Sequence, residues 1–544
     1  MPPESTFDYL VIGSGAAGSV VAARLADANV GSVCVIEAGG DNDRLMVNVP
    51  AGFVHNLKKP ELMWQFGSEP GPNTAGRSVY IPQGKLLGGS TSINGLIYNR
   101  GQAADFDHWA SLGNPGWSYQ DVLPYFRKSE TFDGPASQYR GASGPLRTGG
   151  PEQSHPLCDT FIDAVAALAN APAHTDYNGA VQCSTGYYQR YIHRGRRENV
   201  AARFLKPALA TDRVQIERET LAERLLFDGK RATGVQVSQG GERRQLHARQ
   251  AVLVCAGTVN SAALLQRSGV GDGAHLQRIG IDVVHHLPGV GENFSDHYFL
   301  RAAIRLKAHH VTLNQQSTGW RLGAEILKWL AGRPSILAWS PSIAYAFLNA
   351  QAVLSGQGSA TDQPDLQFVF SHGSYRPGRV YELDTVPAVT CGFTQQRPHS
   401  RGHVRIRSAD PHDTPTVQPN YLVDERDQQA AVDGMQIVRR IIASPGFAPL
   451  VEQEDVPGAD VQSREALLQF ARETGNTGYH LVGTCKLGPA SDPLAVVDTD
   501  LRVHGLDGLR VIDASVMPTV TSSNTCAATT MIGEKGADSL INPH

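Results

Sequence analysis

The stretch FDYLVIGSGAAGSVVAARLAD, residues 7–27, constrains the fold more than any other part of the chain. An apolar run that ends at Ile12 predicts a buried strand, and the apolar spacing that follows predicts a helix. Between them Gly13, Gly15 and Gly18 form G-x-G-x-x-G, which allows a tight turn, a close approach of backbone to a pyrophosphate, and close helix–strand packing. The stretch therefore predicts the start of a parallel βαβ unit.

A dinucleotide is the ligand that such a unit favours. The second predicted strand, SVCVIEAGG, ends in Glu37, nineteen residues after Gly18, where a carboxylate can accept hydrogen bonds from ribose hydroxyls. NAD and FAD share the adenosine diphosphate half, so this motif leaves both open. The residues expected to contact this half are Gly13, Ser14, Gly15, Ala16, Ala17, Gly18, Glu37 and Ala38.

A second glycine cluster, IPQGKLLGGSTSINGLIYNRG, spans residues 81–101. Gly84, Gly88 and Gly89 precede small hydroxyl residues and Asn94, with no helical period before the asparagine. Such a loop can lay backbone amides along a cofactor. A plain surface loop is the alternative, and it explains the hydroxyl residues less well because apolar residues such as Ile93 lie among them.

Composition and charge limit the function classes. At 544 residues the chain predicts two or more packed units, and a net charge of −4 with no run of Lys and Arg disfavours nucleic acid as a partner. Seven scattered cysteines without a C-x-x-C pair favour a reduced compartment. The first residues lack a signal-peptide pattern, and no stretch reaches the ~18 apolar residues of a membrane span. These features predict a soluble, cytoplasmic protein.

Six motifs in order resemble those of the glucose-methanol-choline oxidoreductases, a family of FAD-dependent enzymes. The resemblance runs nearly end to end and implies FAD as the cofactor. Ile93 occupies the position where some members have a histidine bonded to the flavin, so a noncovalently held FAD is implied. The motifs are the loop at 81–101, GTVNSAALLQRSGVG (257–271), LPGVGENFSDH (287–297), RPHSRGHVRIRSADP (397–411), YHLVGTCKLG (479–488) and residues 496–540.

Pattern and resemblance together predict an α/β fold. A Rossmann-type FAD-binding domain, a parallel sheet with helices, is expected from residues 1–155, 220–310 and 475–544. Residues 156–219 and 311–474 are expected to form a substrate-binding domain with an antiparallel sheet flanked by helices.

Alternation of apolar residues places strands of that antiparallel sheet at Leu366, Phe368 and Phe370, and at Val404 and Ile406. Helical spacing predicts helices near 427–443 and, after Ser463 as N-cap, 464–473. The sheet is expected to lie over a pocket, with these helices on its other side.

The resemblance assigns catalytic roles to His480 and Asn524. Oxidation of an alcohol by hydride transfer also removes a proton from oxygen, and a neutral imidazole within hydrogen-bond reach can accept it. Asn524 can stabilise the developing alkoxide. The alternatives are a packed core histidine at 480, a helix N-cap at Asn524 and a simple strand end at Asp513. Further cofactor contacts are implied at Gly84, Leu87, Gly88, Gly89, Ser90, Asn94, Gly95, Ile97, Ala222, Asp513, Ala514, Asn524 and Thr525.

The predicted reaction is oxidation of a primary alcohol to an aldehyde by hydride transfer to flavin N5, with oxygen or a quinone or dye as electron acceptor. Polyols, sugars and choline are alternative substrates, and choline is disfavoured by the low aromatic content and by the lack of a recognisable pocket acid. A redox-neutral hydroxynitrile lyase reaction and photodecarboxylation are further alternatives, the last ranked lowest because it uses asparagine where this chain has His480. The pairs His285–His286 and His309–His310 lack partners at metal spacing, so no metal is predicted.

Overall fold

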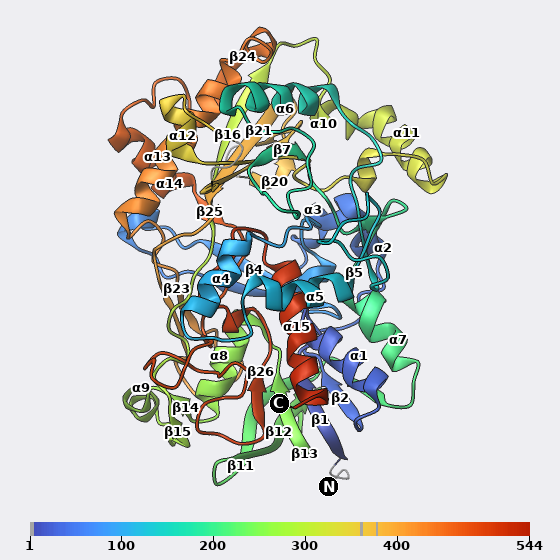
Figure 1. Ribbon diagram of the computed structural model, residues 1–544, viewed down its shortest axis with the longest axis vertical. Helices are drawn as coiled ribbons and strands as arrows, with labels where there is room; N and C mark the ends of the chain where they lie inside the picture. Colours follow the sequence, from blue (N-terminus) through green and yellow to red (C-terminus); the bar gives the residue numbers. More distant parts are fainter. Residues whose placement is uncertain (1–4, 360–362, 377–378, 544) are drawn as a thin grey trace.

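Two seven-stranded sheets organise the chain, one in each half of the molecule as Figure 1 shows it. The computed structural model describes residues 5–359, 363–376 and 379–543. Both ends of the chain lie in the lower half of Figure 1, and the antiparallel sheet lies in the upper half. The α/β fold predicted from the sequence, with a parallel sheet and a separate antiparallel sheet, is confirmed.

The lower sheet is built around β1 (Ser5–Ile12), which runs parallel to β2 (Val33–Ile36) on one side and to β13 (Glu242–Val254) on the other. β10 (Val214–Glu217) pairs with β2, and β26 (Leu509–Val511) pairs with β13. Where β1, β2 and β13 lie side by side, at Tyr9–Ile12, Val33–Ile36 and Ala251–Val254, their residues are apolar and buried, as expected for a parallel sheet covered by helices. An antiparallel hairpin, β11 (Leu221–Asp228) and β12 (Arg231–Gln239), extends the sheet beyond β13.

Helices α1 (Gly18–Ala28) and α15 (Cys526–Ile541) pack together on this sheet. Gly533 allows the contact, because a Cβ there would lie 2.9 Å from the Cα of Ala17. Arg24 and the buried carboxylate of Glu534 form an ion pair at 2.7 Å between the two helices. The packing joins segments about 500 residues apart in the sequence.

The upper sheet is antiparallel throughout. Leu366, Phe368 and Phe370 face a hydrophobic core, whereas Val369 and Ser371 on the same strand line a cavity, as the alternation predicts. The strand order is β24 (Val451–Val456), β16 (Tyr298–Leu306), β21 (Ala388–Gln395), β18 (Leu366–Ser371), β17 (Ala344–Leu348) and β7 (Ser184–Tyr187), with the short β25 (Asn476–Thr477) pairing with β16.

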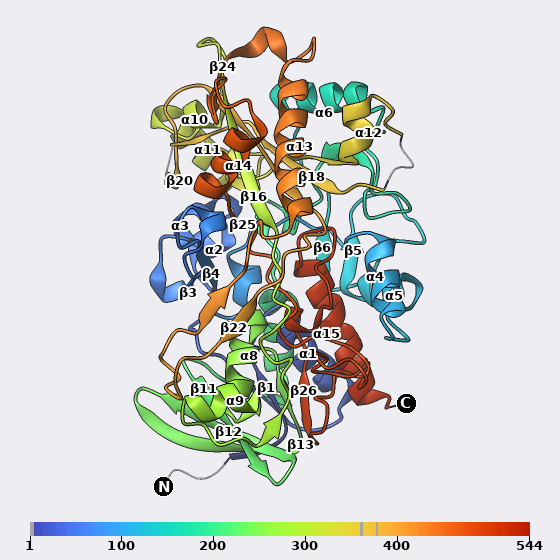
Figure 2. The same ribbon diagram turned by 90° about the vertical axis from the view of Figure 1, so that its left-hand side faces the viewer.

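Three helices cover the outer face of the upper sheet, α6 (Pro156–Ala169), α13 (Glu425–Ile442) and α14 (Arg464–Thr474). Figure 2 shows α13 and α14 beside β16. The predicted helices near 427–443 and 464–473 are confirmed. Ser463 caps α14, since its hydroxyl accepts a hydrogen bond from the backbone N–H of Ala466 at 3.1 Å.

Some strands lie elsewhere than the sequence predicts. The strand with Val404 is β22 (His403–Arg405), which pairs with β23 (Thr416–Gln418) and packs against Phe294, so its placement in the antiparallel sheet is wrong. Alternation on a three-residue strand reveals a buried side but cannot reveal the partner. β10 lies in the lower sheet although residues 156–219 were expected in the substrate domain, and β16 lies in the upper sheet before residue 310.

Among the described residues, no helix combines the length and the apolar character that crossing a bilayer requires.

Candidate active site

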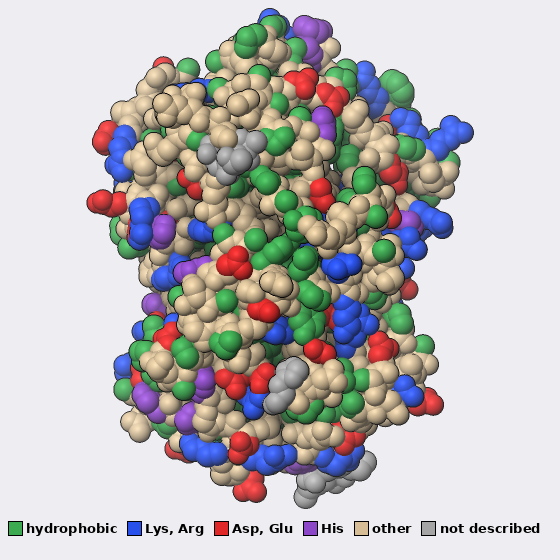
Figure 3. Space-filling view, in the orientation of Figure 1, with side chains coloured by type: hydrophobic (Ala, Val, Ile, Leu, Met, Phe, Trp, Pro, Cys, Tyr) green, Lys and Arg blue, Asp and Glu red, His purple; other side chains and the backbone are tan. Residues whose placement is uncertain are grey.

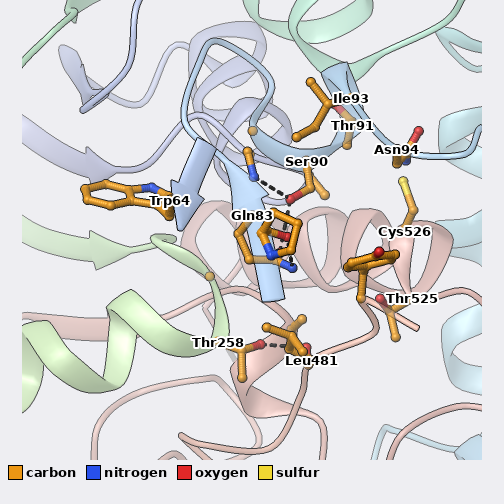
Figure 4. A pocket seen from close by; sticks show the side chains of 18 of the residues that line it. Trp64, Gln83, Ser90, Thr91, Ile93, Asn94, Thr258, Leu481, Thr525 and Cys526 are labelled. Carbon is orange, nitrogen blue, oxygen red and sulfur yellow. Dashed lines mark hydrogen bonds between the residues drawn. The ribbon is translucent and has the colours of Figure 1, made fainter. Parts of the chain in front are cut away.

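One long cavity of about 400 Å³ runs between the two sheets. Its lower wall comes from both glycine-rich loops, the start of β11 and the start of α15, and its upper wall from β16, β18 and β21. Figure 4 shows part of it, with Ile93 and Asn94 of the second glycine loop opposite Cys526 at the start of α15. Most residues predicted for the cofactor and both predicted catalytic residues line this one cavity.

The first glycine turn is shaped by steric limits. Gly13 has a φ of +102°, and a Cβ there would lie 2.4 Å from the carbonyl oxygen of Cys255. A Cβ at Gly18 would lie 2.0 Å from the carbonyl oxygen of Gly13. At Gly15 a Cβ would meet no protein atom within 4 Å, because that side of the backbone faces the cavity. The turn thus fits a group that lies directly against the backbone, as a pyrophosphate does.

Glu37 lies at the end of β2 and is 6% exposed. Its carboxylate accepts hydrogen bonds from the backbone N–H and the hydroxyl of Ser14, at 3.1 and 2.6 Å, and from the backbone N–H of Gly39 at 2.8 Å. Burial raises the pKa of Glu37, and these hydrogen bonds oppose the shift. The carboxylate lines the cavity beside the glycine turn, as a ribose ligand must.

The second glycine loop forms a short 3₁₀ helix, Gly89–Ser92, that meets the first turn. A Cβ at Gly89 would lie 3.0 Å from the Cα of Gly15, so glycine at position 89 permits this approach. The hydroxyl of Ser90 donates to the side-chain oxygen of Gln83 at 3.1 Å, as Figure 4 shows. Ile93 lines the cavity with a hydrocarbon side chain, which contains no nucleophile for a covalent bond to a cofactor.

Three predicted cofactor residues do not line the cavity. Gly18 packs against Gly13, Leu87 belongs to the hydrophobic core, and Gly88 donates its backbone N–H to the hydroxyl of Ser14 at 3.3 Å. These three residues pack against the residues that line the cavity. The predicted residues that do line it are Gly13, Ser14, Gly15, Ala16, Ala17, Glu37, Ala38, Gly84, Gly89, Ser90, Asn94, Gly95, Ile97, Ala222, Asp513, Ala514, Asn524 and Thr525.

The start of α15 closes the lower wall. Thr525 is the N-cap residue, and the unpaired backbone N–H groups of the first turn favour negative charge on a group that lies there. The carboxylate of Asp513 accepts from Gly257 N–H at 2.9 Å and from the hydroxyl of Ser261 at 2.6 Å, and so ties this wall to helix α8 (Gly257–Arg267). Asp513 therefore links the segment after β26 to helix α8, and the alternative of a simple strand end is wrong.

His480 is held by hydrogen bonds at both ring nitrogens. Its Nδ1 lies 2.7 Å from Nδ1 of His297, and its Nε2 lies 2.9 Å from Nδ2 of Asn524. Its backbone N–H donates to Asp296 at 2.8 Å. The ring is 8% exposed and lines the cavity together with Asn524.

These bonds fix which nitrogen of His480 carries the hydrogen. The carbonyl oxygen of Gln396, 2.9 Å from Nε2 of His297, can only accept, so that nitrogen donates. In a neutral ring Nδ1 of His297 then accepts, and Nδ1 of His480 must donate to it. Nε2 of His480 is left with its lone pair, in the position of a base.

Burial keeps both rings neutral. It lowers the pKa of His297 to about 4 and the pKa of His480 well below the usual value for histidine, and the repulsion that two protonated rings would feel adds to the latter shift. Burial raises the pKa of Asp296 to about 6, although hydrogen bonds from Thr477 and Tyr421 oppose the shift.

Asn524 is positioned by a buried carboxylate distant in sequence. Asp105, at the start of helix α4 (Ala103–Ser111), accepts hydrogen bonds from the backbone N–H and the hydroxyl of Ser522, both at 2.7 Å. Gln396 donates to the carbonyl oxygen of Ser522 at 3.1 Å. Oδ1 of Asn524 has no hydrogen-bond partner within the part of the chain that the structure describes, which leaves one buried acceptor open in the site.

Four supporting residues were missed by the sequence reasoning: His297, Asp296, Gln396 and Asp105. The first two end the motif LPGVGENFSDH, so the motif marked the segment without revealing what the side chains hold. Gln396 and Asp105 had no local signal, because their partners lie more than 90 residues away.

One group of potential metal ligands lies away from the cavity lining: His155, Cys158 and His372, whose ligand atoms are within 4.8 Å of one another. Nδ1 of His155 accepts a hydrogen bond from the backbone N–H of Leu157 at 3.2 Å, so the hydrogen of a neutral ring is on Nε2. Burial also raises the pKa of the Cys158 thiol. His155 and Cys158 thus offer protonated rather than ligating atoms, and the absence of a metal stays a prediction.

The fold and the cavity define a class, a protein that binds a dinucleotide cofactor. Two family profiles, each described as GMC oxidoreductase, match residues 7–299 and 398–533. The chain belongs to the GMC oxidoreductase family. It is an FAD-dependent oxidoreductase that acts on CH–OH groups, and the glycine turn, Glu37 and the N-terminus of α15 are suited to hold FAD.

Named relatives extend along the whole chain. The oxygen-dependent choline dehydrogenase of Photobacterium profundum is 35% identical, over 99% of this chain and 93% of its own length. The mitochondrial choline dehydrogenase of Homo sapiens is 37% identical, over 98% and 89%. Pyridoxine 4-oxidase from Mesorbium loti superposes with a TM-score of 0.88 at 27% identity, covering 99% of both chains. Formate oxidase, at 24% identity and a TM-score of 0.89, shares the fold.

Proposed function

We propose that the protein oxidises a primary alcohol to an aldehyde, with His480 as the general base and Asn524 as the group that stabilises charge on the substrate oxygen. The observation that carries the proposal is the hydrogen-bond chain from Gln396 through His297 to His480, which leaves the Nε2 lone pair of a neutral, buried ring in the cavity. FAD, when bound, supplies the acceptor for the hydride.

The residues divide the remaining work. His480 Nε2 takes the hydroxyl proton. Because Nδ2 of Asn524 lies 2.9 Å from that nitrogen, an alcohol oxygen that bonds to one is within reach of the other, and the amide donates to the oxygen as negative charge develops. Asp296 is ionised above about pH 6 and accepts from the His480 backbone, so it offsets part of the positive charge on the protonated ring.

Choline is the second candidate substrate, because the named relatives above are choline dehydrogenases. Aromatic side chains of Trp64, Tyr375 and Tyr479 line the cavity and suit a quaternary ammonium group. No acidic side chain lines the upper wall among the described residues. The electron acceptor, oxygen or a quinone or dye, and a cytoplasmic location both stay predictions.

Anaerobic spectroscopy tests the reaction. A primary alcohol should bleach the flavin without oxygen, whereas a hydroxynitrile lyase substrate would leave it oxidised. Because burial lowers the pKa of His480, the reduction rate should be constant from alkaline pH down to about 6.5 and should fall only at lower pH, as the base becomes protonated. A rate that changes most above pH 7 would remove His480 as the base.

A further inference from the structure

Arg301 is the charged side chain of the upper cavity wall. Four of the described residues that line the whole cavity are Asp, Glu or Arg. Three of them, Glu37, Arg267 and Asp513, belong to the lower half, and the fourth is Arg301. Arg301 lies on β16 of the upper sheet, in the wall that faces His480. A cation is therefore built into the part of the cavity left for the substrate.

The Arg301 guanidinium has no protein partner in the described part of the chain: no hydrogen bond or ion pair joins it to any side chain or carbonyl there. Arg305, four residues on along the same strand, pairs with Asp455 at 3.0 Å. A guanidinium carries five N–H donors, and leaving them unpaired in a half-enclosed site is unfavourable. A cavity-lining arginine without a protein partner is available to bind a ligand.

Arg301 lies on the strand that follows the residue holding the base. β16 follows directly after His297, which holds His480, and the Phe299 ring is 6.3 Å from the His480 ring. Arg301 is two residues further along the same face, which is ~7 Å along a strand. Gly392 lies opposite Arg301 on β21, and an ideal Cβ there would be in ordinary van der Waals contact, 3.5 Å, with the Cγ of Arg301.

We propose that Arg301 binds a carboxylate of the substrate, so that the enzyme prefers alcohols that also carry an anionic group. This rests on the proposed function and deepens it. A planar guanidinium accepts a carboxylate through two parallel hydrogen bonds, which fixes the orientation as well as the affinity. The same charge repels a quaternary ammonium group, which disfavours choline.

The overall charge of the protein does not attract anions. The net charge is −4, and Figure 3 shows acidic and basic side chains interspersed on the face in view. No general field therefore draws an anion to the enzyme. Selection for a carboxylate has to come from a single side chain inside the cavity.

The test compares two alcohols of the same shape. The second-order rate constant of anaerobic flavin reduction, which corresponds to kcat/KM for the alcohol, is measured with 4-(hydroxymethyl)benzoate and with 4-methylbenzyl alcohol. The wild-type protein should prefer the carboxylate, and Arg301→Leu should lower that preference by about tenfold to a hundredfold, the value of one charge-assisted contact. Arg305→Leu, on the same strand but outside the cavity, should retain it.

Charge reversal gives the opposite result. Arg301→Glu should raise kcat/KM for choline relative to 4-(hydroxymethyl)benzoate, and Arg301→Lys should keep part of the carboxylate preference. In the wild-type protein, benzoate should perturb the flavin spectrum at lower concentration than benzamide. This last measurement needs no variant and so does not depend on whether a variant folds.

The outcomes separate the two proposals. Flavin reduction by both alcohols at equal kcat/KM, with benzoate and benzamide binding equally, overturns the carboxylate site and leaves alcohol oxidation in place. Failure of both alcohols to reduce the flavin removes the proposed function and the inference with it. Loss of FAD from Arg301→Leu, without a change in selectivity, would assign the guanidinium to the cofactor and also overturn the proposal.

Discussion

The two ends of the cavity are built by different means. At the cofactor end, three glycines within six residues shape the wall with backbone atoms, and the neighbouring carboxylate of Glu37 follows on the next strand. At the catalytic end, His480 and Asn524 are held by side chains from distant segments, and Asp105 and Ser522 are 417 residues apart. A site formed by backbone atoms can be predicted from a short local motif. A site formed by hydrogen-bonded side chains from distant segments cannot.

The difference also predicts how each end fails. A change at the catalytic end should lower the rate and leave a yellow, folded protein. A change at the cofactor end should lower FAD affinity or stability and leave the chemistry of the remaining holoenzyme intact. Four experiments test this division.

His480→Ala should have the largest effect. It removes the base but no cofactor contact from the glycine turns, and general base catalysis is worth roughly 10²- to 10⁴-fold. Anaerobic stopped-flow reduction by an alcohol should slow by that factor, while FAD content stays that of the parent. His412→Ala, at an exposed position, is the control. A variant that reduces its flavin as fast as the parent would return His480 to the role of a packed core histidine.

Asn524→Ala should slow the same half-reaction by a smaller factor. One donor to a developing oxyanion is worth ~2.7 to 4 kcal/mol. Reoxidation should be unaffected, because the donor acts on the substrate oxygen. If only reoxidation slowed, or if FAD were lost, Asn524 would belong to the cofactor end of the comparison.

Glu37→Ala should act on the cofactor alone. A hydrogen bond to a charged group is worth ~1.5 to 3 kcal/mol, so FAD affinity should fall by about tenfold to a hundredfold. Retention of FAD during dialysis measures the loss, and the rate of flavin reduction in protein reloaded with FAD should match the parent. Unchanged retention would show that Glu37 is not a ribose ligand.

The smallest effects come from a matched pair in the first glycine turn. Gly18→Ala places a Cβ against Gly13 and should lower the free energy of unfolding of the apoprotein by ~1 to 3 kcal/mol. Gly15→Ala meets no protein atom, so the apoprotein should unfold like the parent and only FAD affinity should fall. Denaturant titration with and without FAD measures both. Equal destabilisation of the two apoproteins would contradict the assignment of Gly15 to the cofactor.

The predictability of the molecule follows the same division. The turn at Gly13 to Gly18, Glu37 and the helices at 425–442 and 464–474 could be predicted because periodicity and local motif carry their physics. The positions of His480 and Asn524 came from a resemblance over several motifs. The roles of His297 and Asp105 depend on contacts across the chain, and so does the free guanidinium of Arg301, whose significance lies in the absence of a partner among the described residues. No local sequence pattern predicts these contacts or the lack of a partner for Arg301.

The pairing of α1 with α15 has a consequence for how the protein is made. The first glycine turn leaves the ribosome early, but the helix that packs behind it, and the loop with Asn524 that closes the site, follow about 500 residues later. At ~5 to 20 residues per second this delay is roughly half a minute to two minutes. During that time α15 is not yet available to cover α1. β13, which pairs with β1, is synthesised only about halfway through this interval. The cofactor wall is complete only after synthesis reaches α15, and we expect a nascent chain that stalls earlier to expose an apolar βαβ unit to aggregation.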